Sequence, residues 1–378
     1  MTQPPPPPSG PWGPPGPGGY PGNAPGPQWN PQQGWPQTPP PAPKRGMAKW
    51  IIGAVALVAV ITVTAVVAVS CTKSSGGSDK PTAAPTTSGA PTSDFASAND
   101  TGPVSVITED PSCAPWLPIV NTLAGSQDNG WRQRDPAIPA ELWSPELRNQ
   151  YFAVADAMRQ GADQAEPLAK LTTHRVMRQL YEQFIAYSRA YADSIPTYTQ
   201  ADDQLGVTAV TLGELLSNIC QAINFGSASA RAPLVPPAAG PSSVAPLGDP
   251  SNPAIFLRSV DPTCPDWQST FDDYNSNSAV TTWLKTDPNL PVSQWNPEQK
   301  AATAEVIPVM TDLADRMSKL GSRSSNLTLQ DFASLAVQYQ RAYLQALPTY
   351  SKQDNYLYDA ARFAPGVILG ACKAAGTR

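Results

Sequence analysis

Four cysteines are the residues whose type and spacing most directly predict chemistry. Cys113 and Cys220 are 107 residues apart, and Cys264 and Cys372 are 108 residues apart. An exported, oxidising location would favour a bond within each pair, so we predict the disulfides Cys113–Cys220 and Cys264–Cys372. In the chain-entropy picture, closing a loop of about 100 residues stabilises the fold by roughly 4.7 kcal/mol. Pairing between the two halves is the alternative, and Cys71 is left over in either case.

The two cysteine pairs lie within a sequence that is written twice. The pattern D-P-[ST]-C surrounds the first cysteine of each pair, W-x3-D-P-x2-P-x3-W-[SN]-P-E follows it, and Y-x-R-A-Y-x3-[IL]-P-T-Y-x3-D precedes the second cysteine. These patterns start at Asp110, Trp131 and Tyr187, and again at Asp261, Trp283 and Tyr339. The offset is 151 residues for the first pattern and 152 for the others. Because one single-residue indel reconciles the whole alignment, we interpret it as a tandem duplication.

Repeated polar and aromatic residues are the candidate binding positions. They are Arg189, Asp202, Tyr198 and Trp131 in the first copy, and Arg341, Asp354, Tyr350 and Trp283 in the second. An arginine and an acid in each copy would suit a small binding cleft, whereas ion pairs between adjacent helices are the more ordinary arrangement. The tryptophans would suit a groove for glycan or lipid, although core packing is favoured for such large rings. Tyr198 and Tyr350 each follow a proline closely, and we expect them to be exposed anchors.

Catalytic and cofactor chemistry is not predicted. His174 is the sole histidine, Asn326 occupies its position in the second copy, and no helper residue is near either in sequence. No nucleophile elbow, P-loop, dinucleotide fingerprint or paired-cysteine metal spacing occurs in a supporting context. We therefore assign no catalytic residue, cofactor or metal ligand and expect a protein that is not an enzyme. A net charge of −5 argues against a generally basic nucleic-acid binder.

Each copy has the pattern of a bundle of about four helices. The first helix should begin at Cys113, with Ser112 as its cap, and the second at Ser144-Pro145-Glu146 or Asn296-Pro297-Glu298, where a capping side chain precedes a proline. We expect the second helix to end near Gly161.

The third helix of each copy carries apolar residues at three-and-four spacing. It should begin near Thr173 or Thr328 and end before Pro196 or Pro348, because a proline disfavours helical angles in the residue before it. The fourth helix is expected to be interrupted at Gly213 and Pro365.

The N-terminal part predicts a membrane protein. Residues 50–69 form an uncharged apolar run of 20 residues, enough to span a hydrocarbon core of about 30 Å. Lys44, Arg45 and Lys49 precede it, which places the N-terminus in the cytoplasm and the C-terminal domains outside. A cleaved signal and a loose lipoprotein box ending at Cys71 are the alternatives.

The fold class that we expect is all-α, with two tandem disulfide-closed helical-bundle domains after a single transmembrane helix and a disordered tail. The segments are a Pro/Gly-rich cytoplasmic tail (1–46), a transmembrane helix (47–71), a Ser/Thr/Pro-rich stalk (72–103), helical repeat domain 1 (104–224), a Pro/Ala-rich linker (225–254) and helical repeat domain 2 (255–378).

The run PPPPPSGPWGPPGPGGYPG, the basic KRGMAK before the span and the Ala/Pro/Thr stalk resemble a known arrangement. It is similar to that of the proline-rich single-pass membrane proteins of mycobacteria and related actinobacteria, many of them without assigned function. The resemblance covers roughly the first 100 residues, implies an envelope-facing protein and transfers no catalytic residue.

These observations favour a membrane-anchored, non-enzymatic cell-envelope protein. Its duplicated extracytoplasmic domains would bind a protein partner or an envelope component, and its Pro-rich tail would either contact a cytoplasmic partner or act as a passive spacer. The alternative is a sensor or carrier of a small amphiphilic ligand, a lipid or glycan fragment, in a pocket lined by the matched tryptophans. An envelope hydrolase ranks last.

Overall fold

A computed structural model describes residues 94–377 of the chain, which form one compact unit. Within these residues the secondary structure is helical, without a strand. The predicted tail, transmembrane span and most of the stalk lie outside the described residues, as does Cys71. None of the helices in residues 94–377 is long and apolar enough to cross a membrane.

Three pairs of corresponding helices in the two repeats have the same lengths. In the first repeat they are α2 (Cys113–Gln127), α3 (Pro145–Leu171), α4 (Arg175–Ser194) and α5 (Asp203–Asn224). In the second they are α7 (Cys264–Ser276), α8 (Ser278–Trp283), α9 (Pro297–Arg323), α10 (Leu327–Ala346) and α11 (Asn355–Gly376). The pairs α3/α9, α4/α10 and α5/α11 contain 27, 20 and 22 residues each. The helical bundles are thereby confirmed.

Helix α3 and helix α9 begin as their sequences predict. The Ser144 side chain accepts a hydrogen bond from the Leu147 N–H (3.2 Å), and Asn296 accepts one from the Gln299 N–H (2.7 Å). The expected end near Gly161 is wrong, because α3 continues to Leu171. Gly161 faces the ring of Phe184 on α4, and this packing offsets the roughly 1 kcal/mol that a glycine costs inside a helix.

One of the expected caps is also different. Ser112 makes no capping bond with its side chain; its hydroxyl instead donates to Asp110, which also accepts from the Ser112 N–H (2.9 Å). Helix α10 starts at Leu327, near Thr328 as predicted, and the Asn326 side chain caps it by accepting from the Leu329 N–H (3.0 Å).

The helices α4 and α10 end at Ser194 and Ala346, just before the prolines, as predicted. The expected interruptions of the fourth helix are wrong, since α5 and α11 run without a break through Gly213 and Pro365. Gly213 lies against the rings of Phe184 and Trp116, and Pro365 is buried among the core residues of α11. In both helices, tertiary packing outweighs the local preference of the breaker.

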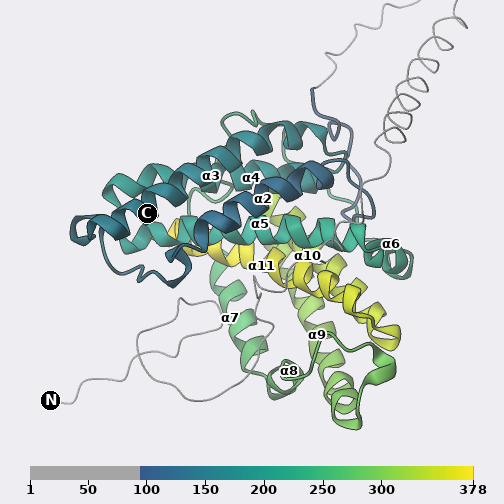
Figure 1. The fold of residues 1–378 in the computed structure, drawn as a ribbon. Coiled ribbons are helices and arrows are strands. Elements are labelled where there is room, and N and C mark those ends of the chain that lie inside the picture. The colour runs from purple at the N-terminus through teal and green to yellow at the C-terminus, as the bar shows by residue number, and fades with distance from the viewer. Residues whose placement is uncertain (1–93, 378) are drawn as a thin grey trace, which may run out of the picture. The chain divides into compact units, whose positions relative to one another are not determined.

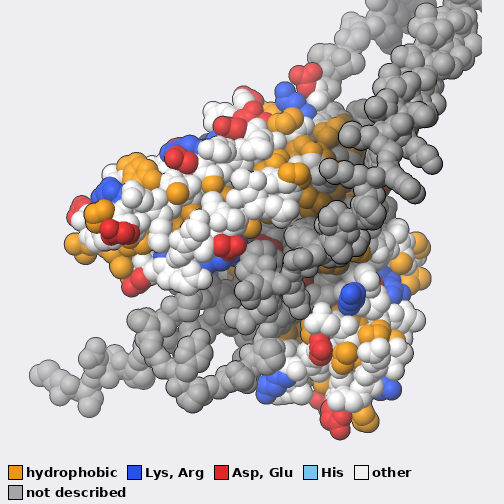
Figure 2. Space-filling view, in the orientation of Figure 1, with side chains coloured by type: hydrophobic (Ala, Val, Ile, Leu, Met, Phe, Trp, Pro, Cys, Tyr) orange, Lys and Arg blue, Asp and Glu red, His pale blue; other side chains and the backbone are white. Residues whose placement is uncertain are grey.

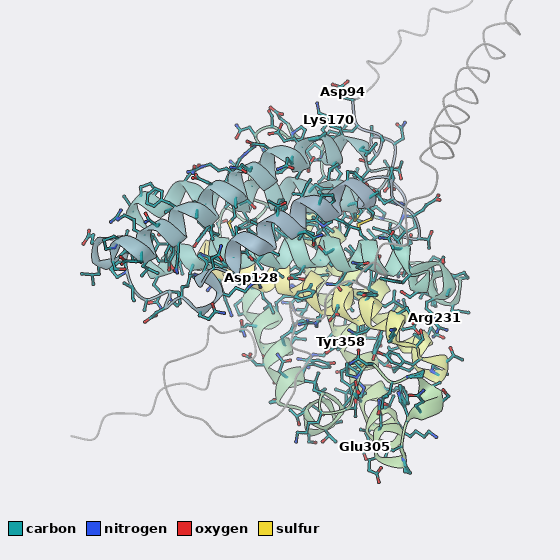
Figure 3. The ribbon with its side chains drawn as sticks, in the orientation of Figure 1. Asp94, Asp128, Lys170, Arg231, Glu305 and Tyr358 are labelled. Atoms are coloured by element: carbon teal, nitrogen blue, oxygen red, sulfur yellow. A yellow bond between two sulfur atoms is a disulfide. The ribbon has the colours of Figure 1, made fainter. Side chains whose placement is uncertain are left out.

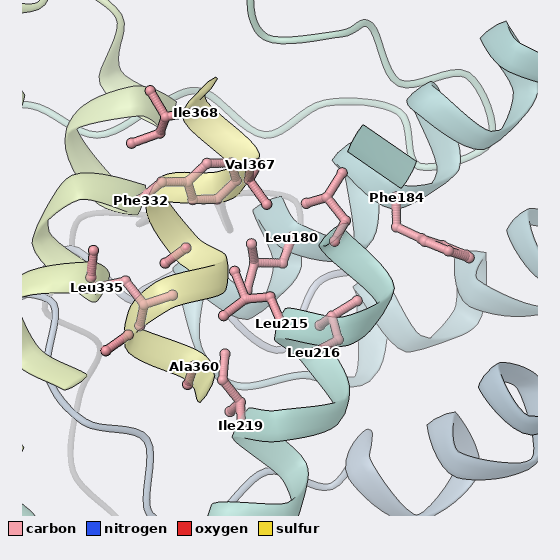
Figure 4. Packing of buried hydrophobic residues seen from close by; sticks show 14 of the residues in the cluster. Leu180, Phe184, Leu215, Leu216, Ile219, Phe332, Leu335, Ala360, Val367 and Ile368 are labelled. Atoms are coloured by element: carbon pink, nitrogen blue, oxygen red, sulfur yellow. The ribbon is translucent and has the colours of Figure 1, made fainter. Parts of the chain in front are cut away.

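The two repeats share one hydrophobic core. Helix α5 packs along α11, and α4 packs against α10 (Figure 1). Figure 4 shows Leu180 and Leu215 of the first repeat beside Val367 and Phe332 of the second. Residues 225–254, which we expected to separate two domains, therefore connect two halves of one unit and include the short helix α6 (Ser227–Arg231).

A buried ion pair also joins the halves. Arg175 of α4 donates from Nε and Nη2 to the two carboxylate oxygens of Asp331 on α10, at 2.9 and 3.0 Å. Its Nη1 donates to the carbonyl oxygens of Asp100 (2.7 Å) and Gly102 (3.1 Å). Gln179 donates to the same Asp331 carboxylate at 2.8 Å. This network ties the segment before α2 to both repeats.

Both predicted disulfides are present. Cys113–Cys220 joins the start of α2 to α5 with the Cα atoms 5.2 Å apart, and Cys264–Cys372 joins α7 to α11 with the Cα atoms 5.7 Å apart. Each bond therefore closes its own repeat, and no bond crosses between them.

Candidate functional site

The predicted arginines belong to ion pairs between neighbouring helices. Arg189 on α4 contacts Asp163 (2.6 Å) and Glu166 on α3, and Arg341 on α10 contacts Asp315 (3.2 Å) on α9. The acidic partners Asp163 and Asp315 are more than half exposed. This is the ordinary arrangement that we weighed against an arginine-centred cleft.

The predicted acids serve a different purpose. Asp202 accepts hydrogen bonds from the backbone and side chain of Thr199, and Asp354 does the same with Ser351. These are capping boxes at the turns before α5 and α11. The Asp354 carboxylate also accepts hydrogen bonds from Nε (3.1 Å) and Nη2 (3.0 Å) of Arg231, which lies in the connection between the repeats. The structure does not bring these acids together with Arg189 or Arg341.

The aromatic residues, in contrast, gather into one cluster in each repeat. The first aromatic cluster consists of Trp131, Trp143, Tyr151, Tyr191 and Tyr198. Trp143 stacks on Tyr151 with the ring centroids 3.9 Å apart, and the Trp131 indole N–H donates to the Tyr191 hydroxyl at 3.0 Å. All five rings are buried.

The expectation that Tyr198 and Tyr350 are exposed anchors is wrong, since they are only 1% and 2% exposed. The turn after α4 or α10 folds each ring inward. Its hydroxyl then donates to a proline carbonyl, that of Pro136 (3.1 Å) or Pro288 (2.6 Å). A buried tyrosine needs such a partner for its hydroxyl, so these residues fasten the Pro-rich loop to the bundle.

An ion pair fills the first cluster. The guanidinium of Arg134 lies over the Trp131 ring, 3.5 Å from its centroid, and donates to the Trp131 carbonyl (3.2 Å) and to Asp203. Both side chains are less than 10% exposed. Burial alone would lower the pKa of Arg134, but the charge and hydrogen bond of Asp203 outweigh burial and raise it. The guanidinium of Arg134 is therefore charged.

The second aromatic cluster consists of Trp283, Trp295, Tyr343, Tyr350 and Tyr358. Tyr358 extends from α11 toward α8, where its ring centroid is 5.0 Å from that of Trp283 (Figure 3). Burial raises the pKa of Tyr358 to about 12, and burial also raises that of Tyr350. Their hydroxyls are consequently neutral at physiological pH.

A recess opens in the second cluster, and all five of its rings line it. Its cavity volume is only about 20 Å³, within about 370 Å³ of empty space that includes open solvent, and Thr286, Gln299 and Asn355 supply polar lining. Thr286 occupies the position of Arg134, and Asn355 that of Asp203. The Thr286 hydroxyl donates to the Trp283 carbonyl at 2.7 Å, as Arg134 does to that of Trp131.

Sequence reasoning missed this recess because it compared only the positions that match between the copies. Arg134 and Asp203 are charged in the first copy and neutral in the second, as Thr286 and Asn355. The sequence signal that could have indicated the recess was the loss of both charged residues of one pair in the second copy, next to tryptophans that both copies keep.

The remaining titratable groups form no catalytic arrangement with the recess. Among residues 94–377, no group of three or more His, Cys, Asp or Glu side chains is placed to hold a metal ion. His174 lies at the start of α4 with Nε2 3.0 Å from the Glu109 carbonyl oxygen. Burial raises the pKa of Glu214 on α5 and of Asp359 on α11, but neither carboxyl lines the recess. On the face shown in Figure 2, acidic and basic side chains are interspersed.

The sequence of the compact unit matches a known family. The model of the family described as "Mycobacterial ESX-1 associated protein" matches residues 95–376, which include both repeats and both disulfides. The chain belongs to this family. The match begins and ends within a residue of the described unit, so both repeats together, rather than one alone, correspond to the family.

A relative from Mycolicibacterium smegmatis (strain MKD8), an uncharacterized protein, is 50% identical to this chain over 350 residues. That alignment covers 92% of this chain and 91% of the relative. No solved structure matches the chain. The mycobacterial part of the predicted resemblance is thus supported.

Proposed function

We propose that this protein is a membrane-anchored, non-enzymatic component associated with the ESX-1 secretion system, and that its two-repeat unit binds a protein partner outside the cytoplasmic membrane. The observation that carries the proposal is the family match over residues 95–376. The description of the family refers to ESX-1, and the matched residues are those of the disulfide-closed unit.

The two disulfides support an extracytoplasmic location for the repeats. Such bonds form and persist in oxidising compartments and are rare in the cytosol. The apolar run of residues 50–69, with three basic residues just before it, supplies an anchor in the corresponding orientation. The Pro-rich segment before it would then face the cytoplasm and meet a second partner there.

The shared core changes how such a partner would be bound. Two modules on a flexible tether would raise affinity by avidity, but α4, α5, α10 and α11 pack into one unit. The repeats therefore offer a single preorganised surface, which lowers the entropic cost of binding. The equal helix lengths at a constant offset support our interpretation that the unit arose by duplication.

Two experiments in mycobacterial cells test this proposal. The first deletes the chain and measures secretion of ESX-1-dependent substrates, with a signal-peptide-dependent exported protein as the control. We expect ESX-1 secretion to fall and the control to stay constant, with recovery by the full chain and not by residues 1–93 alone. Unchanged ESX-1 secretion would refute the association.

The second experiment tests topology with a membrane-impermeant maleimide, in a background in which Cys71 is replaced by serine. Glu305→Cys places a thiol on α9, at the position labelled in Figure 3, and Ser9→Cys places one in the tail. We expect intact cells to label the first variant and only permeabilised cells to label the second. The reverse pattern would overturn the proposed orientation.

A sensor or carrier of a small ligand is the second candidate, and the recess in the second aromatic cluster supports it. The buried tryptophans of the first cluster, filled by Arg134 and Asp203, speak against a long lipid groove along both repeats. A hydrolase stays last, because the three carboxyls whose pKa burial raises, Glu182, Glu214 and Asp359, do not line the recess.

A further inference from the structure

We propose that the recess in the second aromatic cluster binds the guanidinium group of an arginine side chain presented by a protein partner. The inference rests on the partner binding proposed above and adds to it the place of contact and the chemistry of the partner.

The first repeat supplies the template for this site. There the Arg134 guanidinium lies flat against Trp131, 3.5 Å from the ring centroid, with its Nη1 on the Trp131 carbonyl and its Nη2 on Asp203. A planar cation over an indole face is a favourable arrangement. The first aromatic cluster thus shows that the pair of a tryptophan and a tyrosine, here Trp131 and Tyr191, accommodates a guanidinium group. We call this pair of rings the aromatic frame.

The second repeat keeps the frame and lacks the occupant. Trp283 and Tyr343 stand at the positions of Trp131 and Tyr191, but Thr286 is too short to cover the indole as Arg134 does. Tyr358, at the position of Gly206, fills only part of the space, since a recess remains beside it.

The charges around the recess favour a cation over a neutral guest. Three carboxylates adjoin the lining. Asp287 lies between the lining residues Thr286 and Pro288, and Asp354 directly precedes the lining residue Asn355. Asp359 accepts a hydrogen bond from the Asn355 side chain (2.9 Å). Asp354 is paired with Arg231, and Asp359 with Arg362.

Asp287 differs from the other two acids. It lies between the lining residues Thr286 and Pro288, is exposed, and takes part in no ion pair among the described residues. Its Oδ1 only accepts hydrogen bonds from Asn289. One negative charge at the mouth is therefore left for a guest to neutralise.

The shape of the site favours arginine over lysine. A guanidinium is planar, stacks on aromatic faces and is weakly hydrated, whereas an ammonium is a compact and strongly hydrated charge. In the lining, the amide nitrogens of Asn355 and Gln299 already donate to Asp359 (2.9 Å) and to the Asp287 carbonyl (3.0 Å). Their amide oxygens can therefore accept from the N–H donors of a guanidinium.

The test is a ligand titration of the purified full chain in detergent, followed by saturation-transfer NMR of the ligand. The probes are N-acetylarginine amide and its neutral isostere N-acetylcitrulline amide. We expect the arginine probe to bind about tenfold more tightly, as a cation–π contact and a nearby carboxylate imply. Equal binding of both probes, or binding of neither, would overturn the inference.

Two variants locate the binding. The double substitution T286R/N355D rebuilds the internal pair of the first repeat and should abolish binding of the arginine probe, with the melting temperature showing that the protein is folded. Asp287 is exposed, so D287N should leave the fold intact. It should weaken binding of the arginine probe several-fold without changing the affinity for the citrulline probe. Arginine binding that survives both substitutions would refute the site, whether or not the double variant folds well.

Free L-arginine separates a partner's side chain from a small metabolite. Its α-carboxylate would lie near Asp287, so we expect it to bind more weakly than the amide; tighter binding would overturn docking of a protein side chain. The ESX-1 proposal fails separately, since it depends on secretion after deletion. If secretion falls but the arginine probe does not bind, only the present inference is lost.

Discussion

Replacing Asp331 with alanine should destabilise the protein far more than replacing Asp315, although each acid pairs with an arginine of α4 or α10. The side chains of Arg175 and Asp331 are 2% and 5% exposed, whereas those of Arg341 and Asp315 are 33% and 56% exposed. Asp315→Ala is therefore the matched control for Asp331→Ala.

The magnitude follows from what Asp331→Ala leaves behind. Removing one partner of a buried ion pair typically costs about 3–5 kcal/mol, because the other charge stays buried without compensation. Asp100 lies 3.6 Å from Arg175 and offsets part of that charge, while Gln179 loses its acceptor. We expect a loss of about 3 kcal/mol in the free energy of unfolding, against less than about 1 kcal/mol for Asp315→Ala.

The assay is urea unfolding of the full chain in detergent, followed by tryptophan fluorescence, with thermal melting as a second measure. A loss of about 3 kcal/mol corresponds to a melting temperature lower by about 10 °C. The double variant R175M/D331L removes both charges and should recover much of the stability.

Equal effects of Asp331→Ala and Asp315→Ala would refute the reasoning, because they would mean that burial of the pair between the repeats is not what makes it costly to break. A double variant no more stable than Asp331→Ala would point instead to lost packing.

Three further outcomes are expected. C264S/C372S should lower the free energy of unfolding by up to about 4–5 kcal/mol, since this bond closes a loop of 108 residues; thermal melting with and without reductant measures this. Burial raises the pKa of Glu214 in the folded protein, so ionising it costs stability at any pH above the pKa of the unfolded chain. E214Q should therefore raise the melting temperature at pH 7, and the gain should vanish toward pH 4. In G321A the new Cβ would lie 2.4 Å from a side chain of α10 and should cost about 1–3 kcal/mol in urea unfolding; G125A, with open space around it, should cost nothing.

Local signals in the sequence predicted the parts of the fold that depend on few neighbours. Ser144 and Asn296 start helices because their side chains reach an N–H three residues on. Pro196 and Pro348 end helices because the proline ring restricts the preceding residue. The cysteine pairs followed from their place in each repeat, and both bonds form within a repeat.

Where several helices meet, the same local signals failed. Gly161, Gly213 and Pro365 lie inside continuous helices, because the packing of those helices outweighs a cost of about 1–3 kcal/mol for each breaker. Tyr198 and Tyr350 looked exposed beside a proline, yet the turn carries them inward to a carbonyl.

The candidate site shows the same division. Its aromatic residues could be predicted from the sequence, since tryptophan and tyrosine recur at constant spacing in both copies. Whether the aromatic frame is filled or open depends on side chains from segments far apart in the chain, such as Arg134 and Asp203 in the first copy. Helix type, bond pairing and repeat register thus came from the chain's order of residues, because each depends on short-range chemistry or symmetry. The shared core of the two repeats and the recess in the second aromatic cluster, in contrast, depend on contacts between side chains that are far apart in the chain.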